Sequence, residues 1–406
     1  MAKGGFKTRI PLADALGMLT RQGFEIESEE VSFDLALGRV LAEDVVSEMN
    51  NPPFDRAMMD GYAVVAEDTF GASQTNPVSL KVVGVTVAGD SVSAPVGRGE
   101  AVKIMTGAKA PVGADCVVMV EYTQEKDGVV EITTAVPPGK HISEVGEDIK
   151  KGDLLLKAGT VLKPQDLGVL AATGNLKVRV KKKPRVVVVS TGTELATPGE
   201  KLVSGAIYDI NSYTLSSLAE GIGAEVVLRK IIGDRESELE DVLDLEWDLL
   251  LLSGATSVGE LDFVPEVIKR RGEIVFHGVN IRPGSPAGFG VVAGRQVFML
   301  PGFPVAATTA FELLVTPFIQ QMLGAKIAVP HPAIEGVLMK AVPSQLGRID
   351  FVRVRIERRD GKISVAPVSA KGAGLITTLT KADGFVLLDA KKEGLEAGDA
   401  VRVYLF

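Results

Sequence analysis

The chain has 406 residues, of which 46% are hydrophobic and 24% are charged, and such a composition is typical of a folded protein with several domains. Its net charge of −8 disfavours nucleic acid and anionic membranes as partners and favours small molecules and proteins. The amino terminus lacks the apolar stretch of a signal peptide, and no later segment is apolar for the roughly 20 residues of a membrane span. We therefore expect a cytoplasmic protein.

Cysteine and histidine are too scarce to suggest a zinc site. The single cysteine, Cys116, has no second thiol with which to form an internal disulfide. The three histidines, His141, His277 and His331, are widely separated in the chain. We therefore expect any bound metal to have oxygen ligands.

The first part of the chain begins with a helix and continues with strands. The helix is predicted from Pro11, and its apolar residues share one face: Leu12, Ala15, Leu16 and Leu19. Between residues 50 and 138, β-branched runs alternate with Gly, Pro and Asp turn signals, which predicts a small all-β domain. The basic segment 181–184 predicts an exposed linker at a domain boundary.

The second part alternates short apolar runs with helical patterns between residues 185 and 323. Continuous apolar strands that alternate with helices predict a parallel sheet covered on both faces. Beyond Pro330, hydrophobic and polar residues alternate again, which predicts a further β domain. The predicted fold class is therefore α/β and β, in several domains.

Polar, glycine-rich turns follow four of the predicted strands, at 190–194, 233–234, 253–260 and 301–304. Open parallel sheets bind ligands at the carboxyl ends of their strands, where glycines let backbone N–H groups approach an anion. Together the turns predict a site for a phosphate-bearing ligand, and helix capping is the alternative reading of each turn alone. Neither GxxxxGK(S/T) nor GxGxxG follows a strand, which disfavours nucleotide hydrolases and dinucleotide dehydrogenases.

Acidic residues accompany these turns. Carboxylates beside a phosphate suit Mg²⁺, which binds carboxylate and phosphate oxygens together, so phosphoryl chemistry is the functional interpretation. The alternative is that Asp234 caps a helix and that Asp209 and Asp60 are turn residues. The full set near the strand ends is Glu194, Asp209, Asp234 and Asp262, and Asp60 and Asp148 flank the predicted β domain.

Several ordered blocks of sequence resemble the molybdopterin molybdotransferases and the related gephyrin E domain. Residues 53–64, PFDRAMMDGYAV, resemble the Met-Asp-Gly-Tyr-Ala signature of these proteins. Together the blocks cover most of the chain between residues 50 and 320, and the α/β part also resembles the molybdopterin adenylyltransferases. The other matching blocks, in family order, are 104–108, 111–118, 146–149, 190–195, 208–211, 253–262 and 300–302.

The resemblance implies an enzyme that inserts molybdate or tungstate into adenylylated molybdopterin and releases AMP, with Mg²⁺ present. It implies an elongated homodimer, in which the α/β domain of one subunit binds the pterin and the small β domain of the other completes the site. The molybdopterin adenylyltransferase is a candidate protein partner. The implied domains are an elongated linking domain (1–28, 45–51 and 146–180), a small β domain (29–44 and 52–145), an α/β molybdopterin-binding domain (181–325) and a C-terminal β-barrel-like domain (330–406).

The resemblance also implies roles for individual residues, carried over by their position in the matching blocks. The catalytic residues would be Asp60, Thr106, Asp148 and Glu194. The substrate-binding residues would be Thr193, Asp209, Asp234, Ser253, Gly254, Ser257, Asp262, Pro301 and Gly302. The oxyanion would contact Arg282, Ser285, Arg348, Thr377 and Thr378, and the magnesium ligands would be Glu194 and Asp209.

The chain departs from the family pattern around the implied oxyanion site. Arg282 and Ser285 stand where the family has the two lysines of Lys-Pro-Gly-Lys. Phe303 and Ala306 stand where the family has the Asn and Ser of Pro-Gly-Asn-Pro-Val-Ser, and Ala255 replaces a glycine. Arg282 keeps a permanently charged fork, so the oxyanion site is either remodelled, for example for tungstate, or belongs to a paralogue with changed activity.

These departures keep other functions open. One alternative is a paralogue with altered oxyanion specificity, and another is a dimeric scaffold that binds pterin without catalysis. The α/β part alone would also suit an adenylyltransferase. Retention of Asp60, Thr106, Glu194 and Asp262 favours catalysis over the scaffold, whereas the changes at Ser285, Phe303 and Ala306 favour the scaffold. The segments with Asp60 and Thr106 favour the insertion enzyme over the adenylyltransferase.

Overall fold

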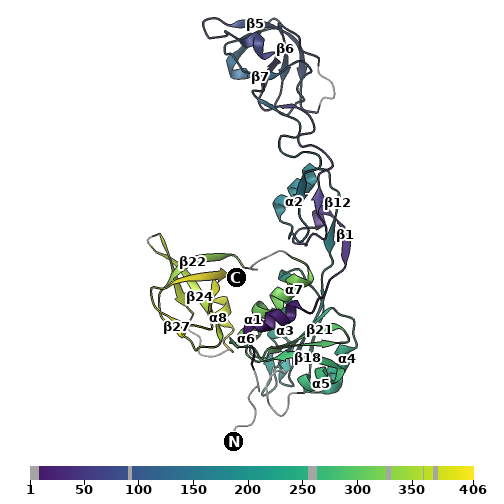
Figure 1. Cartoon of the computed structure of the whole chain (residues 1–406), viewed down its shortest axis with the longest axis vertical. Helices are drawn as coiled ribbons and strands as arrows, with labels where there is room; N and C mark the ends of the chain where they lie inside the picture. The colour runs from purple at the N-terminus through teal and green to yellow at the C-terminus, as the bar shows by residue number, and fades with distance from the viewer. Residues whose placement is uncertain (1–8, 90–93, 255–262, 326–330, 360, 369–373) are drawn as a thin grey trace.

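The computed structural model describes residues 9–89, 94–254, 263–325, 331–359, 361–368 and 374–406. Figure 1 shows an elongated molecule with a small β domain at one end, a narrow linking part, an α/β domain at the other end and a C-terminal β domain beside it. This arrangement confirms the predicted fold class. Within the described residues, no helix combines the length and apolar character needed to cross a bilayer.

The small β domain contains a six-stranded sheet in the order β7-β4-β6-β5-β9-β8. Side chains such as Tyr62, Val64 and Val118 form a core of its own, which agrees with the predicted small all-β domain. The strands are β4 (Gly61–Val64), β5 (Val78–Thr86), β6 (Glu100–Ile104), β7 (Cys116–Met119), β8 (Thr123–Lys126) and β9 (Val129–Ile132), with a separate pair of β3 (Arg56–Ala57) and β10 (Ile142–Ser143).

Two passes of the chain form the linking part. Strand β1 (Ser28–Ser32) pairs antiparallel with β12 (Lys177–Lys181), and β2 (Val45–Val46) pairs with β11 (Leu154–Leu156). Their apolar side chains share a core with helix α2 (Pro164–Ala172). Residues 29–44 thus pair and pack with the linking part, which differs from the expected assignment to the small β domain. The partners lie far apart in sequence, so local alternation does not reveal the pairing.

The α/β domain is built on a mixed six-stranded sheet in the order β16-β13-β17-β21-β20-β18. The first four strands are parallel, as predicted, whereas β20 runs antiparallel to both of its neighbours. The antiparallel edge arises because β20 joins β21 through the tight turn at Ala293 and Gly294, both with positive φ. The strands are β13 (Arg185–Thr191), β16 (Glu225–Ile232), β17 (Leu249–Gly254), β18 (Gly272–His277), β20 (Gly288–Val292) and β21 (Arg295–Pro301).

Helices cover both faces of this sheet. Val186 and Val188 face a core shared with one group of helices, and Val187 and Val189 face a core shared with the other group. This burial on both faces explains why the strand is a continuous apolar run. The first group is α1 (Leu12–Thr20), α3 (Asn211–Gly221), α6 (Pro304–Ala310), the π-helical turn η4 (Phe311–Val315) and α7 (Thr316–Met322); the second is α4 (Glu236–Leu243) and α5 (Val264–Arg271).

Helix α1 confirms the predicted helix near the amino terminus, but it packs in an unexpected place. Leu12, Ala15 and Leu19 are buried in the core of the α/β domain. The expected assignment placed residues 1–28 in the linking domain. Ile10, two residues before the helix, is also anchored to the α/β domain, through a bridge to Val279.

The C-terminal domain forms a closed barrel in which β24 pairs with both β25 and β26. A short strand of the α/β domain, β19 (Ile281–Arg282), adds to this barrel by pairing parallel with β24. Phe351 and Phe385 stack with centroids 4.2 Å apart and join the core of the α/β domain, so the two domains pack together. The barrel strands are β22 (Ala333–Leu338), β24 (Ile349–Arg359), β25 (Lys362–Pro367), β26 (Gly384–Leu388) and β28 (Ala400–Leu405).

Candidate active site

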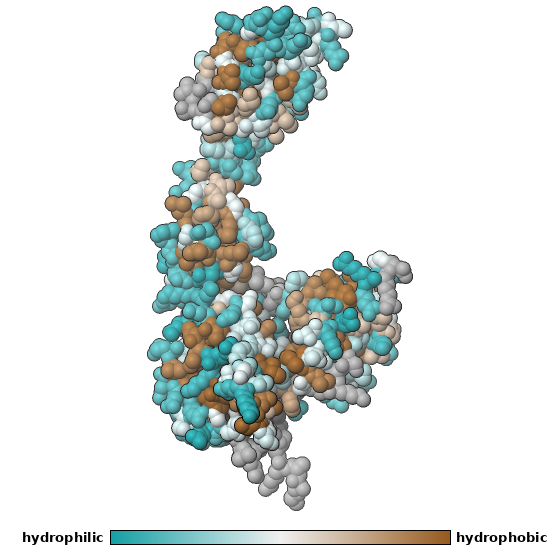
Figure 2. Space-filling model, turned by 180° about the vertical axis from the view of Figure 1, so that it is seen from behind, coloured by the Kyte–Doolittle hydropathy of each residue, from teal (hydrophilic) through white to brown (hydrophobic). Residues whose placement is uncertain are grey.

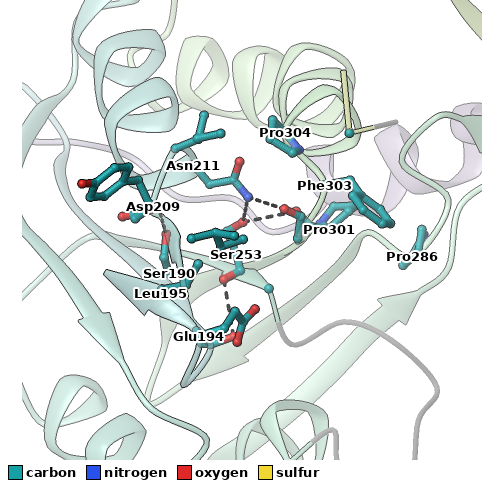
Figure 3. Close-up of a pocket in the computed structure, with 17 residues that line it drawn as sticks. Ser190, Glu194, Leu195, Asp209, Asn211, Ser253, Pro286, Pro301, Phe303 and Pro304 are labelled. Carbon is teal, nitrogen blue, oxygen red and sulfur yellow. Dashed lines mark hydrogen bonds between the residues drawn. The ribbon is translucent and has the colours of Figure 1, made fainter. Parts of the chain in front are cut away.

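A cavity of about 620 Å³ lies at the carboxyl ends of β13, β17 and β21, where the sequence predicted a ligand site. Figure 3 shows side chains from these strand ends and from the start of α3 pointing into it. The structure therefore brings together the following predicted residues: Glu194, Asp209, Ser253, Gly254, Pro301 and Gly302.

Asp209 is buried in the floor of this cavity. Its Oδ1 atom accepts a hydrogen bond from the hydroxyl of Ser190 at 2.8 Å and another from the backbone N–H of Ser212 at 3.1 Å. Its Oδ2 atom is buried and has no hydrogen-bond partner within the described residues. Asp209 thus ties the start of α3 to β13, and its second oxygen is a buried acceptor beside the cavity.

Asn211 is a residue of the site to which the sequence analysis gave no role. Its side-chain amide donates to the hydroxyl of Ser253 and to the carbonyl of Gly302, both at 2.7 Å, and the Ser253 hydroxyl donates to the Pro301 carbonyl at 3.2 Å (Figure 3). The carbonyl oxygen of the Asn211 side chain is buried without a described partner. One side chain therefore links the ends of β17 and β21. The only sequence signal was its place directly after Asp209 and Ile210.

Two glycines lie where the strand ends approach each other closely, and the geometry requires glycine at Gly254. Gly254 has φ of +124°, and a Cβ there would lie 2.3 Å from the carbonyl oxygen of Thr191. A Cβ on Gly302 would lie 3.2 Å from the Cα of Gly254. These glycines therefore allow the strand ends to approach each other at the cavity.

Thr193 and Asp234 meet beside the cavity without lining it. The Thr193 hydroxyl donates to Asp234 Oδ2 at 3.2 Å, and both side chains are exposed. The backbone N–H of Gly233 donates a hydrogen bond to the carboxylate of Glu238 at 2.7 Å. This turn is therefore also bonded to the first part of helix α4. From the 190–194 turn, Ser190, Thr191 and Glu194 line the cavity.

A second cavity of about 210 Å³ adjoins the first and shares Pro286, Pro301 and Phe303 with it. The predicted oxyanion residues Arg282, Ser285 and Arg348 line this smaller cavity. The large cavity thus presents carboxylates and hydroxyls, and the small cavity presents guanidinium groups.

Asp350 holds the two predicted arginines in place. This carboxylate is only 1% exposed and forms ion pairs with Arg282 and with Arg348, the latter at 3.2 Å between Oδ1 and Nε. Ser344 donates its hydroxyl to Asp350 Oδ2 at 2.7 Å. Arg282 donates a hydrogen bond to this buried carboxylate, which fixes the direction of its guanidinium group, whereas the contact with Arg348 is an ion pair without hydrogen-bond geometry. The sequence analysis assigned Asp350 no role.

Thr377 and Thr378 do not line either cavity. They begin the short helix α8 (Thr377–Thr380), where the Thr378 hydroxyl donates to the Leu375 carbonyl at 2.7 Å. From this segment Gly374 reaches the large cavity, where a Cβ on it would contact the ring of Phe303 at 3.4 Å. The structure therefore does not bring the predicted threonines to the arginines.

Asp60 and Thr106 lie on the small β domain, at the far end of the molecule from both cavities (Figure 1). Thr106 donates its backbone N–H and its hydroxyl to Asp60, and these bonds, the backbone bond first, hold the pKa of Asp60 below its ordinary value. Asp148 accepts a hydrogen bond from Asn51 at 3.2 Å, where the chain passes between the small β domain and the linking part. One subunit alone does not bring these residues to the cavities.

Two further predicted residues, Ser257 and Asp262, lie outside the described residues. Among the described residues, no group of three His, Cys, Asp or Glu side chains could hold a metal ion. The predicted magnesium ligands Glu194 and Asp209 do line the same cavity.

Three family models match the chain in succession. The MoeA N-terminal region (domain I and II) matches residues 10–174, a probable molybdopterin binding domain matches residues 187–321, and the MoeA C-terminal region (domain IV) matches residues 335–406. These boundaries place the two cavities mainly in the molybdopterin binding domain.

The chain is also similar to individual proteins over nearly its full length. It is 39% identical to a putative molybdopterin biosynthesis protein of Methanocaldococcus jannaschii, over 93% of this chain and 92% of that one. It is 34% identical to a molybdopterin molybdenumtransferase of Haemophilus influenzae, over 96% of each. The crystal structure of a molybdopterin biosynthesis MoeA protein from Pyrococcus horikoshii matches with a TM-score of 0.85 and 34% identity, covering 98% of this chain and 100% of that one. The chain therefore belongs to the MoeA family of molybdenum cofactor biosynthesis proteins.

Proposed function

We propose that the protein inserts molybdate or tungstate into adenylylated molybdopterin and releases AMP. The observation that carries the proposal is the adjacency of the two cavities across the shared wall of Pro286, Pro301 and Phe303. The larger cavity suits an organic substrate with hydrogen-bond donors, and the smaller one suits an oxyanion. Binding both reactants side by side favours their reaction, because their relative orientation is fixed before the chemical step.

The residues of the two cavities have distinct roles in this proposal. Arg282 and Arg348 bind the metal oxyanion and offset its charge as it approaches the dithiolene sulfur atoms. Asp209 and Asn211 accept hydrogen bonds from the organic substrate with the oxygens that lack described partners. Glu194 and Asp209 also fit a magnesium ion shared with substrate phosphate oxygens, and such an ion would neutralise charge on the departing AMP.

We propose further that the active form is a homodimer in which Asp60 and Thr106 of one subunit reach the cavities of the other. The distance between these residues and the cavities of the same chain supports the proposal (Figure 1). The linking part also exposes large apolar side chains, with Leu35 72%, Leu37 56% and Leu176 75% exposed. Figure 2 shows hydrophobic residues over this part of the surface. Such a surface favours contact with a second subunit.

The proposed reaction can be tested directly with purified protein. Adenylylated molybdopterin is added with Mg²⁺, with or without molybdate or tungstate, and the released ligands are identified by mass spectrometry. We expect AMP and the metal-bearing pterin only when the oxyanion is present. Release of unchanged adenylylated pterin under all conditions would favour the scaffold function.

A second candidate is the same reaction with altered oxyanion specificity. Ser285 and Ala306 both line the small cavity. Ser285 lacks the ammonium group of the lysine in the family pattern, and Ala306 lacks the hydroxyl group of the serine in that pattern. We expect Ser285→Lys to tighten oxyanion binding by roughly tenfold or to change the preference between molybdate and tungstate, because it adds a charged donor. Location in the cytoplasm and contact with the adenylyltransferase stay predictions.

A further inference from the structure

Phe303 exposes an aromatic ring in the wall between the two cavities. The residue is 65% exposed, although phenylalanine is usually buried, and it lines both the large and the small cavity. Figure 3 shows it on the side of the large cavity where Pro286 and Pro301 lie. The family pattern has an asparagine at this position, so the resemblance assigns no function to an aromatic ring here.

The backbone that carries this ring is held in place on both sides. Before Phe303, the carbonyl of Gly302 accepts a hydrogen bond from the side-chain amide of Asn211 at 2.7 Å. After it, Pro304 begins helix α6, and the carbonyl of Phe303 accepts the backbone N–H of Ala307 at 2.9 Å. Because the ring is attached to a fixed backbone, little conformational entropy is lost when a ligand packs against it.

The C-terminal part of the chain supports one side of the ring. A Cβ on Gly374 would lie 3.4 Å from Cδ1 and 3.7 Å from Cε1 of Phe303, so the backbone of Gly374 lies close to these two atoms. Gly374 also lines the large cavity. Since Phe303 is nonetheless largely exposed, much of its ring surface is open to a ligand.

The large cavity combines this ring with hydrogen-bond acceptors. Asp209 Oδ2 and Asn211 Oδ1 are buried without a hydrogen-bond partner within the described residues, and both residues line the cavity. A flat heteroaromatic ring with amino groups has the complementary properties, because its edge donates hydrogen bonds and its faces are apolar. Such faces stack on aromatic side chains, which removes both surfaces from water. A substrate that contains such rings therefore matches both features of the cavity.

We propose that Phe303 stacks on a flat heteroaromatic ring of the substrate, which is the pterin or the adenine of adenylylated molybdopterin. This inference rests on the proposed function, because it takes the large cavity as the site of the organic substrate. It assigns substrate affinity to a ring that stands where the family pattern has an amide.

The test measures binding of adenylylated molybdopterin to the full chain by equilibrium dialysis, without molybdate or tungstate. We expect Phe303→Leu to weaken binding by roughly tenfold, because leucine is apolar but has no flat aromatic face. Phe303→Tyr keeps this face and should retain the wild-type affinity. The matched control is Phe70→Leu, which removes a ring of a residue 57% exposed on the small β domain and should not change the affinity.

Two fragments of the substrate identify the ring that stacks. Molybdopterin without the adenylate contains the pterin, and AMP contains the adenine. If Phe303→Leu weakens binding of molybdopterin alone, the pterin stacks on Phe303, and if it weakens binding of AMP alone, the adenine does. Equal weakening of both fragments would indicate a distorted cavity and contradict stacking on one ring, and unchanged binding of both would also contradict the inference.

A parallel Asp209→Asn variant separates failure of this inference from failure of the proposed function. It replaces a buried carboxylate of the large cavity with an amide of the same shape. If Asp209→Asn loses affinity for adenylylated molybdopterin and Phe303→Leu keeps it, Phe303 does not stack and the large cavity stands as the substrate site. Equal losses in Phe303→Leu and Phe303→Tyr would also contradict stacking. If the wild type binds no adenylylated molybdopterin, or if none of these variants changes its binding, the large cavity is not the substrate site and both proposals fall.

Discussion

Thr106 donates two hydrogen bonds to the same carboxylate oxygen of Asp60, one from its backbone N–H at 2.6 Å and one from its hydroxyl at 2.7 Å. Both bonds favour the charged carboxylate and lower its pKa, and the backbone bond makes the larger contribution. Asp60 thus stays ionised to a lower pH than an isolated aspartate would.

Thr106→Val should raise the pKa of Asp60 part of the way to its ordinary value, because the backbone bond remains. The fall in activity on acidification should then begin at higher pH, which a pH profile of kcat measures. Thr106→Ser keeps the hydroxyl and serves as the control. If kcat of the valine and serine variants falls at the same pH on acidification, the hydroxyl of residue 106 does not lower the pKa of Asp60.

Asn211→Ala should destabilise the α/β domain by about 1–3 kcal/mol, because the hydroxyl of Ser253 and the carbonyl of Gly302 lose a buried donor. The measurement is the free energy of unfolding in urea. An exposed turn residue, Asn76, offers a control, and Asn76→Ala should have a much smaller effect. If Asn211→Ala and Asn76→Ala lower the free energy of unfolding by the same amount, Asn211 does not link the ends of β17 and β21.

His331 connects the α/β domain to the C-terminal barrel and should make this connection pH-dependent. Its Nε2 atom lies 2.8 Å from the buried carboxylate of Glu312, and its Nδ1 atom lies 2.8 Å from the carbonyl oxygen of Leu405. The hydrogen bond to Glu312 is the main cause that raises the pKa of His331 above 6.5. The protonated ring donates to both oxygens, so its contribution to stability is fully present below pH 6.5 and is lost as the pH rises through the raised pKa.

Urea unfolding of the wild type and of His331→Asn checks this prediction. The wild type should be more stable than the variant at pH 6, and this difference should shrink at pH 8.5. His141→Asn is the matched control, because the His141 ring bonds a backbone carbonyl, that of Val117, on the small β domain. A stability difference that does not change with pH would rule out a protonated His331 as the connecting group.

Complementation between two inactive variants tests the shared site. Asp60→Ala removes a group on the small β domain, and Asp209→Ala removes one in the large cavity, so each should be inactive alone. When the two are co-expressed, the mixed dimer contains one intact composite site. Random pairing in a twofold dimer should therefore restore about a quarter of the wild-type activity.

Light scattering of each variant should show the same dimer as the wild type, which makes the comparison valid. Activity that stays absent after mixing, with mixed dimers demonstrated by affinity tags, would show that the site does not combine residues of two subunits.

Hydrophobic patterning was sufficient to predict most helices and strands of the α/β domain, but not the antiparallel strand β20. Strands β13, β17 and β21 are continuous apolar runs because both faces of the sheet are covered, and their carboxyl ends line the cavity, whereas the turn after β16 does not reach it. The partners of Asp350 and Asn211 were not predictable from such patterns. Their hydrogen bonds join residues whose proximity depends on how three strands and the barrel pack together.

The position of residues 29–44 was missed for a similar reason. Val31 pairs with Val178, and the whole small β domain separates the two in sequence. Arg9 precedes the predicted helix and has no motif around it, so only the packing of α1 shows that it lines the small cavity. Local signals thus predict elements, whereas the site depends on contacts between distant segments.

The chain enters and leaves the small β domain at one place, where Asn51 and Ile149 exchange backbone hydrogen bonds of 2.7 and 3.0 Å. The domain is therefore an insertion between the two passes of the linking part. During synthesis on the ribosome, β1 emerges long before its partner β12, and the small β domain is complete in the interval. We expect this domain to fold first, since domains generally fold as units as they emerge. The edge of β1 stays open until β12 arrives, so a delay in translation between them should expose the nascent chain to chaperones.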